Sequence, residues 1–305
     1  MRVLLTNDDG VSAPGLAALT RALMRWAEAS GAEHELVVMA PSTNFSGAGA
    51  AVGSVSDRTT IAYQRARIEG AERVEAYGLN ASPALSVITG ALGAVGPKPD
   101  LVLSGINHGV NVGRSILHSG TVGAALTASQ LGISALAVSL RAGGTPDPWE
   151  SAADLAVALI PLLAAAPART VLNLNVPALP LSDIRGLRWA RVSGVGLIKA
   201  AIGSAASDTP NRPEMEGPAA AEGARASMSG PPGERGEIVL TVGSPFPQGD
   251  PDADLPEASE DAALVAQGYA ALTALRGPRA EDDPELIGLI DSALPAALAP
   301  LGLSR

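Results

Sequence analysis

Short apolar runs alternate with helix-like segments along the first part of the chain. The first run, Val3–Thr6, has the length of a buried strand. A segment from Pro14 to Gly31 follows, with apolar residues at helical spacing, a proline suited to the first turn and a glycine suited to the end. Leu36–Ala40 is a second apolar run of strand length. A strand, a helix and a second strand in this order are typical of a parallel α/β sheet.

The same alternation continues to about residue 180. We expect further strands at Arg73–Tyr77, Asp100–Ser104, Ala135–Leu140 and Thr170–Val176, and helices at Pro83–Leu92, Thr121–Leu131 and Ala152–Ala165. This pattern predicts one doubly wound α/β domain with a mostly parallel sheet, which we place at residues 1–200.

The last third of the chain has a different composition. Residues 203–236 are rich in Gly, Pro, Ser and Ala without periodicity, which predicts a flexible insertion. Beyond it, Glu237–Val242 is strand-like, Asp261–Gln267 follows an acidic stretch as a short helix, and the last 25 residues are helical in pattern. We therefore expect residues 237–305 to form a C-terminal strand and helical arm that packs on the core or on a partner subunit.

Composition narrows the classes of function. The chain of 305 residues is 47% hydrophobic but only 3% aromatic, so its core must be built from Ala, Val, Leu and Ile. A net charge of −10 argues against a nucleic-acid duplex as partner. The absence of cysteine excludes disulfides and thiolate chemistry. The apolar start is too short for a signal peptide, and no membrane-spanning run stands out, so we expect a cytoplasmic protein with no membrane partner.

Two adjacent carboxylates, Asp8 and Asp9, follow the first strand in the sequence Asn7-Asp8-Asp9-Gly10. In an open α/β sheet, ligands bind beyond the carboxyl ends of the strands, where these side chains should lie. A turn or helix cap is the simpler reading of a single Asp. A pair after an apolar strand favours a functional role, and hard oxygen ligands suit Mg²⁺, Mn²⁺ or Ca²⁺. No G-x-G-x-x-G follows this strand, so the dinucleotide fingerprint is absent.

A small polar loop, Pro41–Gly49, follows the second strand and contains Ser46. Its hydroxyl and amide groups could bind a metal ion or a phosphate. Taken alone, the local pattern favours an ordinary loop of Gly and Ser residues.

A longer loop, Ser104–Gly113, follows a later strand and carries Asn107 and Asn111. Beyond it, a helix opens with Ser119, Gly120 and Thr121. Backbone amides at a helix N-terminus bind anions, and hydroxyl groups add donors. Helix capping by Ser119 or Thr121 is the alternative, and it is compatible with phosphate binding. The density of Gly and polar residues favours a ligand-binding loop.

Two histidines, His108 and His118, flank this region. Neither has a neighbouring carboxylate in the sequence to orient it, so we assign neither as a catalytic acid or base. A Ser/His/Asp triad is not indicated, since no G-x-S-x-G motif is present.

Together these motifs resemble those of the survival protein SurE family of nucleotidases. The resemblance is carried by LLTNDDG-x-x-APG at residues 4–15, APSTNFSGAG at 40–49, SGIN-x-G-x-N-x-G at 104–113 and SGTVGAA at 119–125. The resemblance is strong over about residues 1–200 and weak over the C-terminal part. Their occurrence together, in this order and at these loops, makes the resemblance specific.

The resemblance implies a divalent-metal-dependent phosphomonoesterase that hydrolyses nucleoside 5′- or 3′-monophosphates, and sometimes short polyphosphate. It implies a Rossmann-like fold whose C-terminal arm is exchanged between subunits of a homodimer or homotetramer. One Mg²⁺ or Mn²⁺ per subunit is expected, with Ca²⁺ as an alternative occupant in crystals. The family's metal ligands fall on Asp8, Asp9, Ser46 and Asn107.

The same resemblance suggests how catalysis would be divided among these residues. We expect Asp8 or Asp9 to assist a water molecule as nucleophile, because phosphoryl transfer depends mainly on charge neutralisation and positioning. The residues expected to hold the phosphate oxygens are Asn111, Ser119, Gly120 and Thr121.

The chain departs from the family pattern at several positions outside the expected metal ligands. These are Leu85 in place of Asp, Arg114 and Ser115 in place of an acidic pair, His118 in place of Tyr, and Thr127 in place of Glu. They motivate an alternative, a catalytically reduced homologue that binds a phosphate or nucleotide ligand without efficient turnover. A transferase with an Asp-x-Asp metal site is a third reading, but Asp252-Ala-Asp254 lies in an acidic, proline-rich stretch that argues against it.

Overall fold

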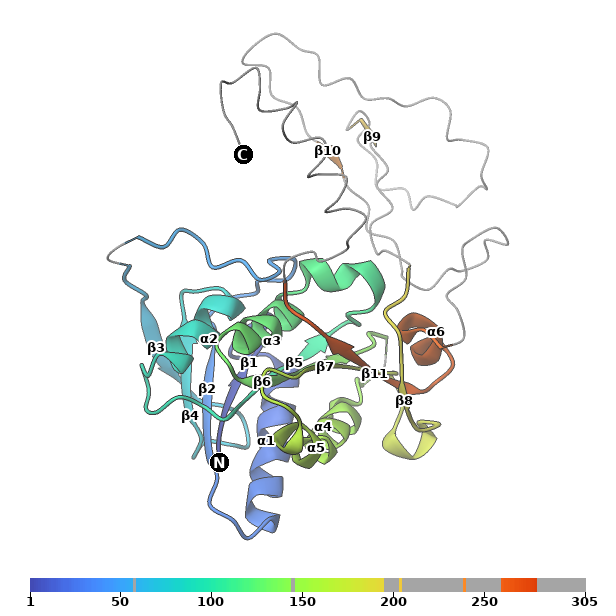
Figure 1. Cartoon of the computed structure of the whole chain (residues 1–305), viewed down its shortest axis with the longest axis horizontal. Coiled ribbons are helices and arrows are strands. Elements are labelled where there is room, and N and C mark those ends of the chain that lie inside the picture. Colours follow the sequence, from blue (N-terminus) through green and yellow to red (C-terminus); the bar gives the residue numbers. More distant parts are fainter. Residues whose placement is uncertain (57–58, 144–145, 195–202, 205–237, 240–258, 279–305) are drawn as a thin grey trace, which may run out of the picture. The chain divides into compact units, whose positions relative to one another are not determined.

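A nine-stranded sheet organises the described part of the chain (Figure 1). The computed structural model describes residues 1–56, 59–143, 146–194, 203–204, 238–239 and 259–278. The strands of the sheet, in chain order, are β1 (Arg2–Thr6), β2 (Glu35–Pro41), β3 (Tyr63–Ala66), β4 (Glu75–Leu79), β5 (Leu101–His108), β6 (Ser134–Leu140), β7 (Val171–Val176), β8 (Leu187–Trp189) and β11 (Ala270–Leu275). A separate antiparallel pair joins β9 (Gly203–Ser204) to β10 (Ile238–Val239).

The strand order of the sheet is β3-β4-β2-β1-β5-β6-β7-β11-β8. The strands from β4 to β7 run parallel to one another. Only the pairs β3 with β4 and β7 with β11 are antiparallel. The expected doubly wound, mostly parallel α/β fold is therefore confirmed.

Helices cover both faces of this sheet (Figure 1). One face carries α1 (Pro14–Ala29), α4 (Trp149–Ala158) and α5 (Ile160–Ala165), and the other carries α2 (Pro83–Ala91) and α3 (Gly120–Gln130). Strand β1 shows how the sequence supplies both layers. Val3 and Leu5 pack in the first layer and Leu4 in the second, because successive side chains of a strand point to opposite faces.

The chain reverses its direction of winding at β1. It runs from β1 outward through β2 to β4, then returns to place β5 on the other side of β1. Helix α1 after β1 and helix α3 after β5 lie on opposite faces of the sheet. This arrangement leaves a crevice beyond the carboxyl ends of β1 and β5, the usual ligand position in such folds.

Several elements differ in extent from the expected ones. Strand β5 extends beyond the expected strand end at Ser104 into the predicted loop and ends at His108. The helix expected at Ala152–Ala165 begins earlier, at Trp149, and is divided into α4 and α5 at Leu159. Pro161 in the first turn of α5 explains the division, since proline has no N–H to continue the hydrogen bonds of α4.

Three strands of the nine-stranded sheet, β3, β8 and β11, were not expected from the sequence. Strand β11 has the sequence Ala-Ala-Leu-Thr-Ala-Leu, whose Ala and Leu residues favour helix on intrinsic propensity. Its pairing with β7 on one side and β8 on the other overrides that preference. The edge strand β3 is short and mostly exposed, so it carries no apolar alternation to detect.

The chain divides into two compact units, Met1–Leu275 and Arg276–Arg305. The first includes α6 (Asp261–Ala266), the short helices η1 (Gly113–His118) and η2 (Leu181–Asp183), and β11. Apart from 203–204, the expected insertion at 203–236 lies outside the described residues. The helix expected over the last 25 residues also lies outside them. Within the described ranges, no helix has the length and apolar character needed to cross a membrane.

Candidate active site

The turn after β1 is closed by the side chain of Asn7. Its amide nitrogen donates to the Gly10 carbonyl oxygen at 2.9 Å, and the Gly10 N–H donates back to Asn7 Oδ1 at 3.3 Å. Gly10 has a φ of 108°, which favours glycine at this point of the turn. Asp8 and Asp9 are thereby held directly beyond the carboxyl end of β1.

Asp8 is buried beneath the start of α3. Only 3% of the residue is exposed, and its Oδ1 accepts a hydrogen bond from the Thr121 hydroxyl at 2.5 Å. A Cβ added to Gly120 would lie 2.7 Å from Asp8 Cβ and 2.8 Å from Oδ2. Glycine is therefore required for α3 to approach the carboxylate this closely.

The surroundings of Asp8 make its charge costly. Burial raises the pKa of Asp8 above its usual value, the Thr121 hydrogen bond opposes that effect, and the charge of Asp9 adds to it. A cation beside the two carboxylates would remove this cost.

Asp9 occupies a more open position than Asp8 and is only partly buried. Its Oδ2 accepts the backbone N–H of His108 at 3.1 Å, and its Oδ1 lies 3.5 Å from the amide nitrogen of Asn44. Asp9 therefore links the loop after β2 to the end of β5.

The other two expected metal ligands are brought to the same edge of the sheet by their neighbours. Phe45, next to Ser46, donates its N–H to the Asp8 carbonyl oxygen at 2.7 Å. Asn107 immediately precedes His108, and its amide nitrogen donates to the Gly109 carbonyl oxygen at 2.6 Å. Since that nitrogen is engaged, the side-chain oxygen of Asn107 is the atom suited to a cation.

The donor set at this edge consists of oxygen atoms. In the part of the chain that the structure describes, no three His, Cys, Asp or Glu side chains gather as a metal-binding group. A cation would thus depend on the hydroxyl of Ser46 and the amide oxygen of Asn107 as well as on the carboxylates of Asp8 and Asp9. Such neutral and charged oxygens fit Mg²⁺ or Mn²⁺, and the ligand assignment stays a prediction.

The hydroxyl groups at the start of α3 are already engaged. Ser119 caps the helix, with its Oγ accepting the Val122 N–H at 3.1 Å, and the Thr121 hydroxyl donates to Asp8. The first N–H groups of a helix have no partner within it. That of Thr121 stabilises the Asp8 carboxylate, since its hydrogen bond lowers the pKa of Asp8. Phosphate binding here would rest on the backbone, with the two side chains positioning it.

Asn111 is held in a buried network instead. Its amide nitrogen donates to Ser139 Oγ in β6 at 2.8 Å, and its N–H donates to Asn175 Oδ1 at 2.7 Å. The amide nitrogens of Asn173 and Asn175 both donate to its carbonyl oxygen. These contacts fix the loop after β5 to β6 and β7, and a direct contact of Asn111 with phosphate stays a prediction.

A cavity of about 460 Å³ opens beside Asp9. It includes two residues that the sequence did not single out, Asp147 and Trp149. His108 Nε2 lies 3.1 Å from Asp147 Oδ2, so the histidine does have a carboxylate partner. No sequence spacing could show this, because the partner comes from the loop after β6.

The departures from the family pattern lie on α2, η1 and α3. His118 and Arg114 are exposed on η1, and the Thr127 hydroxyl donates to the Gly123 carbonyl oxygen within α3. Among the described residues, none of the five departing side chains is hydrogen-bonded to Asp8 or Asp9. The side-chain hydrogen bonds to the Asp8 and Asp9 carboxylates thus involve none of these substitutions.

Comparisons with known proteins agree with the motifs. The family model described as survival protein SurE matches residues 3–196. The chain is 40% identical over 193 residues to the 5′/3′-nucleotidase SurE of Cronobacter sakazakii, covering 63% of this chain and 69% of that protein. It is 42% identical over 194 residues to the 5′-nucleotidase SurE of Pseudomonas putida, covering 63% and 71%.

A solved structure shows the same fold. The SurE protein from Aquifex aeolicus matches 96% of this chain and 100% of its own, with a TM-score of 0.67 and 25% identity. The family match at residues 3–196 spans every residue of the site described above.

Proposed function

Because the chain belongs to the survival protein SurE family, we propose that it is a divalent-metal-dependent phosphomonoesterase that hydrolyses nucleoside 5′- or 3′-monophosphates. The observation that carries the proposal is the pair Asp8 and Asp9 beyond the carboxyl end of β1, with Asp8 against the N-terminus of α3. Curated relatives of about 40% identity are named as nucleotidases.

Four residues would hold the cation in this proposal: Asp8, Asp9, Ser46 and Asn107. Mg²⁺ is usually bound through one or two carboxylates, with water and substrate phosphate completing its shell. Once bound, such a cation neutralises phosphate charge and lowers the pKa of water.

Residues of the chain itself would bind the phosphate, position Asp8 and accept the proton. The N–H groups of Gly120 and Thr121 would bind phosphate oxygens at the positive end of α3. The Thr121 hydroxyl holds Asp8 in place. Asp9 lines the open cavity, so it is the carboxylate placed to accept a proton from an attacking water.

The alternative function is binding without efficient turnover. Its motivation is the altered segment 114–128, where Arg114, Ser115 and His118 depart from the family pattern, together with the Gly- and Pro-rich stretch 203–236. Both functions use the same phosphate site, so the measurement of turnover separates them.

The test is phosphate release from a panel of nucleoside monophosphates, with Mg²⁺ or Mn²⁺ titrated against an EDTA control. We expect cation-dependent release by the wild-type protein and a loss of roughly 100-fold or more in Asp9→Asn. Asp183→Asn, an exposed carboxylate on η2, is the matched control and should retain full activity. An Asp9→Asn variant with the wild-type rate would overturn the proposal, and nucleotide binding without release would favour the alternative.

A further inference from the structure

Trp149 forms part of the wall of the cavity that opens beside Asp9. The cavity volume of about 460 Å³ is in the range of small-molecule sites. The side chains that matter here are those of Asp9, Ser12, Ser42, His108, Asp147 and Trp149. The carboxylates of Asp9 and Asp147 and the indole ring of Trp149 therefore line the same cavity.

The position of Trp149 is set by close packing of α1. A Cβ added to Gly15 would lie 2.9 Å from Trp149 Cζ3 and 2.1 Å from the Ile106 carbonyl oxygen. Only glycine lets α1 lie so near both the indole and β5. The ring is thus held by the protein itself, before any ligand binds.

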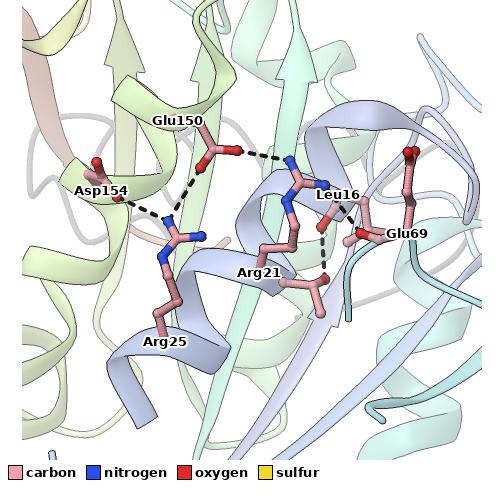
Figure 2. Close-up of polar contacts among 7 residues, drawn as sticks. Leu16, Arg21, Arg25, Glu69, Glu150 and Asp154 are labelled. Carbon is pink, nitrogen blue, oxygen red and sulfur yellow. Dashed lines mark hydrogen bonds and ion pairs between the residues drawn. The ribbon is translucent and has the colours of Figure 1, made fainter. Parts of the chain in front are cut away.

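An ion-pair network ties α4, which begins at Trp149, to α1 (Figure 2). Arg21 lies 2.8 Å from one oxygen of Glu150, and Arg25 lies 3.3 Å from the other. Arg25 also lies 3.5 Å from Asp154. Glu150 directly follows the tryptophan, so the network holds the start of α4 on α1.

His108 connects the aromatic part of the cavity to the carboxylates. Its ring centroid lies 5.6 Å from that of Trp149, and its Nε2 pairs with Asp147. Its backbone N–H donates to Asp9. A ligand whose phosphate lies at the start of α3, with a cation between it and the carboxylate pair, would meet the two rings with the rest of its structure.

We propose that the nucleobase of a nucleoside monophosphate binds against Trp149 in this cavity, with the His108–Asp147 pair beside it. The inference rests on the proposed function and deepens it, because it makes Trp149 the residue that selects nucleotides over other phosphomonoesters. Every base has a π-face, so stacking on an aromatic ring tolerates different bases. The hydroxyl groups of Ser12 and Ser42 are available in the same cavity for the ribose.

The test compares two substrates that differ only in the base: adenosine 5′-monophosphate and ribose 5-phosphate. We expect Trp149→Ala to lower kcat/KM for the nucleotide by roughly tenfold or more, mainly through KM. The loss on ribose 5-phosphate should be several-fold smaller. Trp149→Phe, which keeps a ring, should restore most of the nucleotide activity. The matched control is Trp189→Ala in β8, whose side chain is exposed, and it should change neither substrate.

Two outcomes would overturn the inference alone. Equal losses on both substrates would mean that Trp149 only supports packing, and an unchanged nucleotide kcat/KM would mean that it makes no contact. If the wild-type protein hydrolyses neither substrate, the proposed function fails instead. Equilibrium dialysis with adenosine then decides the inference, which requires weaker binding by Trp149→Ala than by the wild type and fails if the two bind equally.

Discussion

Asp8 and Asp9 are neighbours in the chain, yet their carboxylates have different surroundings. Asp8 is buried against Gly120 and hydrogen-bonded by Thr121, whereas Asp9 is partly buried and lines a cavity. The chain bends at Asp8 and Asp9, in the turn closed by Asn7 and Gly10, so the two side chains point in different directions. Without a cation, the burial of the charged Asp8 carboxylate thus destabilises the protein. The Asp9 carboxylate is the one that water can reach.

Removal of the Asp8 charge should stabilise the metal-free protein. In EDTA at neutral pH, we expect Asp8→Asn to raise the free energy of unfolding by on the order of 1 kcal/mol. The buried negative charge disappears, while the Asn oxygen can still accept from Thr121. Urea unfolding measures the difference, and added Mg²⁺ should stabilise the wild type but not the variant.

Asp183→Asn serves as the control for this experiment, since its carboxylate is exposed. A metal-free Asp8→Asn protein less stable than the wild type would show that the buried charge is already compensated within the chain.

At the scale of elements, the contact between α1 and α4 is stabilised by charge as well as by apolar packing (Figure 2). Partial burial alone would raise the pKa of Glu150. Hydrogen bonds and charges from Arg21 and Arg25 outweigh that effect and hold the pKa below its ordinary value of 4.5. A carboxyl group whose pKa is lowered on folding stabilises the folded state only while it is ionised.

Glu150→Gln should therefore destabilise the protein in a pH-dependent manner. At pH 7 we expect a loss of about 0.5–1 kcal/mol, because the pair is largely exposed and screened by solvent. The contribution is complete above about pH 4.5 and disappears as the pH falls through the lowered pKa. Urea unfolding at pH 7 and at about pH 3 should thus show a difference from the wild type that shrinks in acid.

Glu33→Gln, an exposed residue before β2, is the matched control for the loss of one negative charge. A Glu150→Gln deficit of the same size at both pH values would assign the effect to packing rather than to the ion pairs.

At the scale of the whole molecule, Asp261 joins a late segment of the chain to the loop after β5. It is fully buried, and its Oδ2 accepts the Gly113 N–H at 3.1 Å. Its Oδ1 accepts the N–H groups of Ser193 and Ala262 at 3.0 and 2.8 Å. One carboxylate on α6 thereby fixes the start of η1, which leads to the N-terminus of α3.

Asp261→Asn should weaken the fold as a whole. An amide nitrogen replaces one acceptor oxygen and meets an N–H donor, which leaves a buried donor unpaired. We expect a loss of about 1–3 kcal/mol in the free energy of unfolding, with a single transition in urea. Asp183→Asn is again the control. An unchanged midpoint would contradict the role given to Asp261.

The sequence alone predicted much of the fold, because periodicity along a segment reports which of its faces is buried. It also predicted the edge at which Asp8, Asp9, Ser46 and Asn107 lie. The two carboxylates follow β1, Ser46 follows β2, and Asn107 lies near the carboxyl end of β5. The family resemblance is confirmed by the matching family model, and the roles of these residues as ligands stay predictions. Strand β11 escaped detection because its Ala and Leu residues form a strand only through pairing with β7 and β8.

Tertiary structure alone decided what surrounds that edge. Asp147 reaches the cavity from the loop after β6, and Trp149 from the start of α4. Asn111 is hydrogen-bonded to β6 and β7. The physical reason is that the pattern of apolar and polar residues in one segment reflects only which of its sides is buried and which is exposed to solvent. Contacts between segments far apart in the chain depend on how closely those segments pack. The close approach of Gly15 in α1 to Trp149 in α4 is one example. The sequence by itself thus determined the sheet and its paired carboxylates, and the packing of helices on that sheet decided what lies beside them.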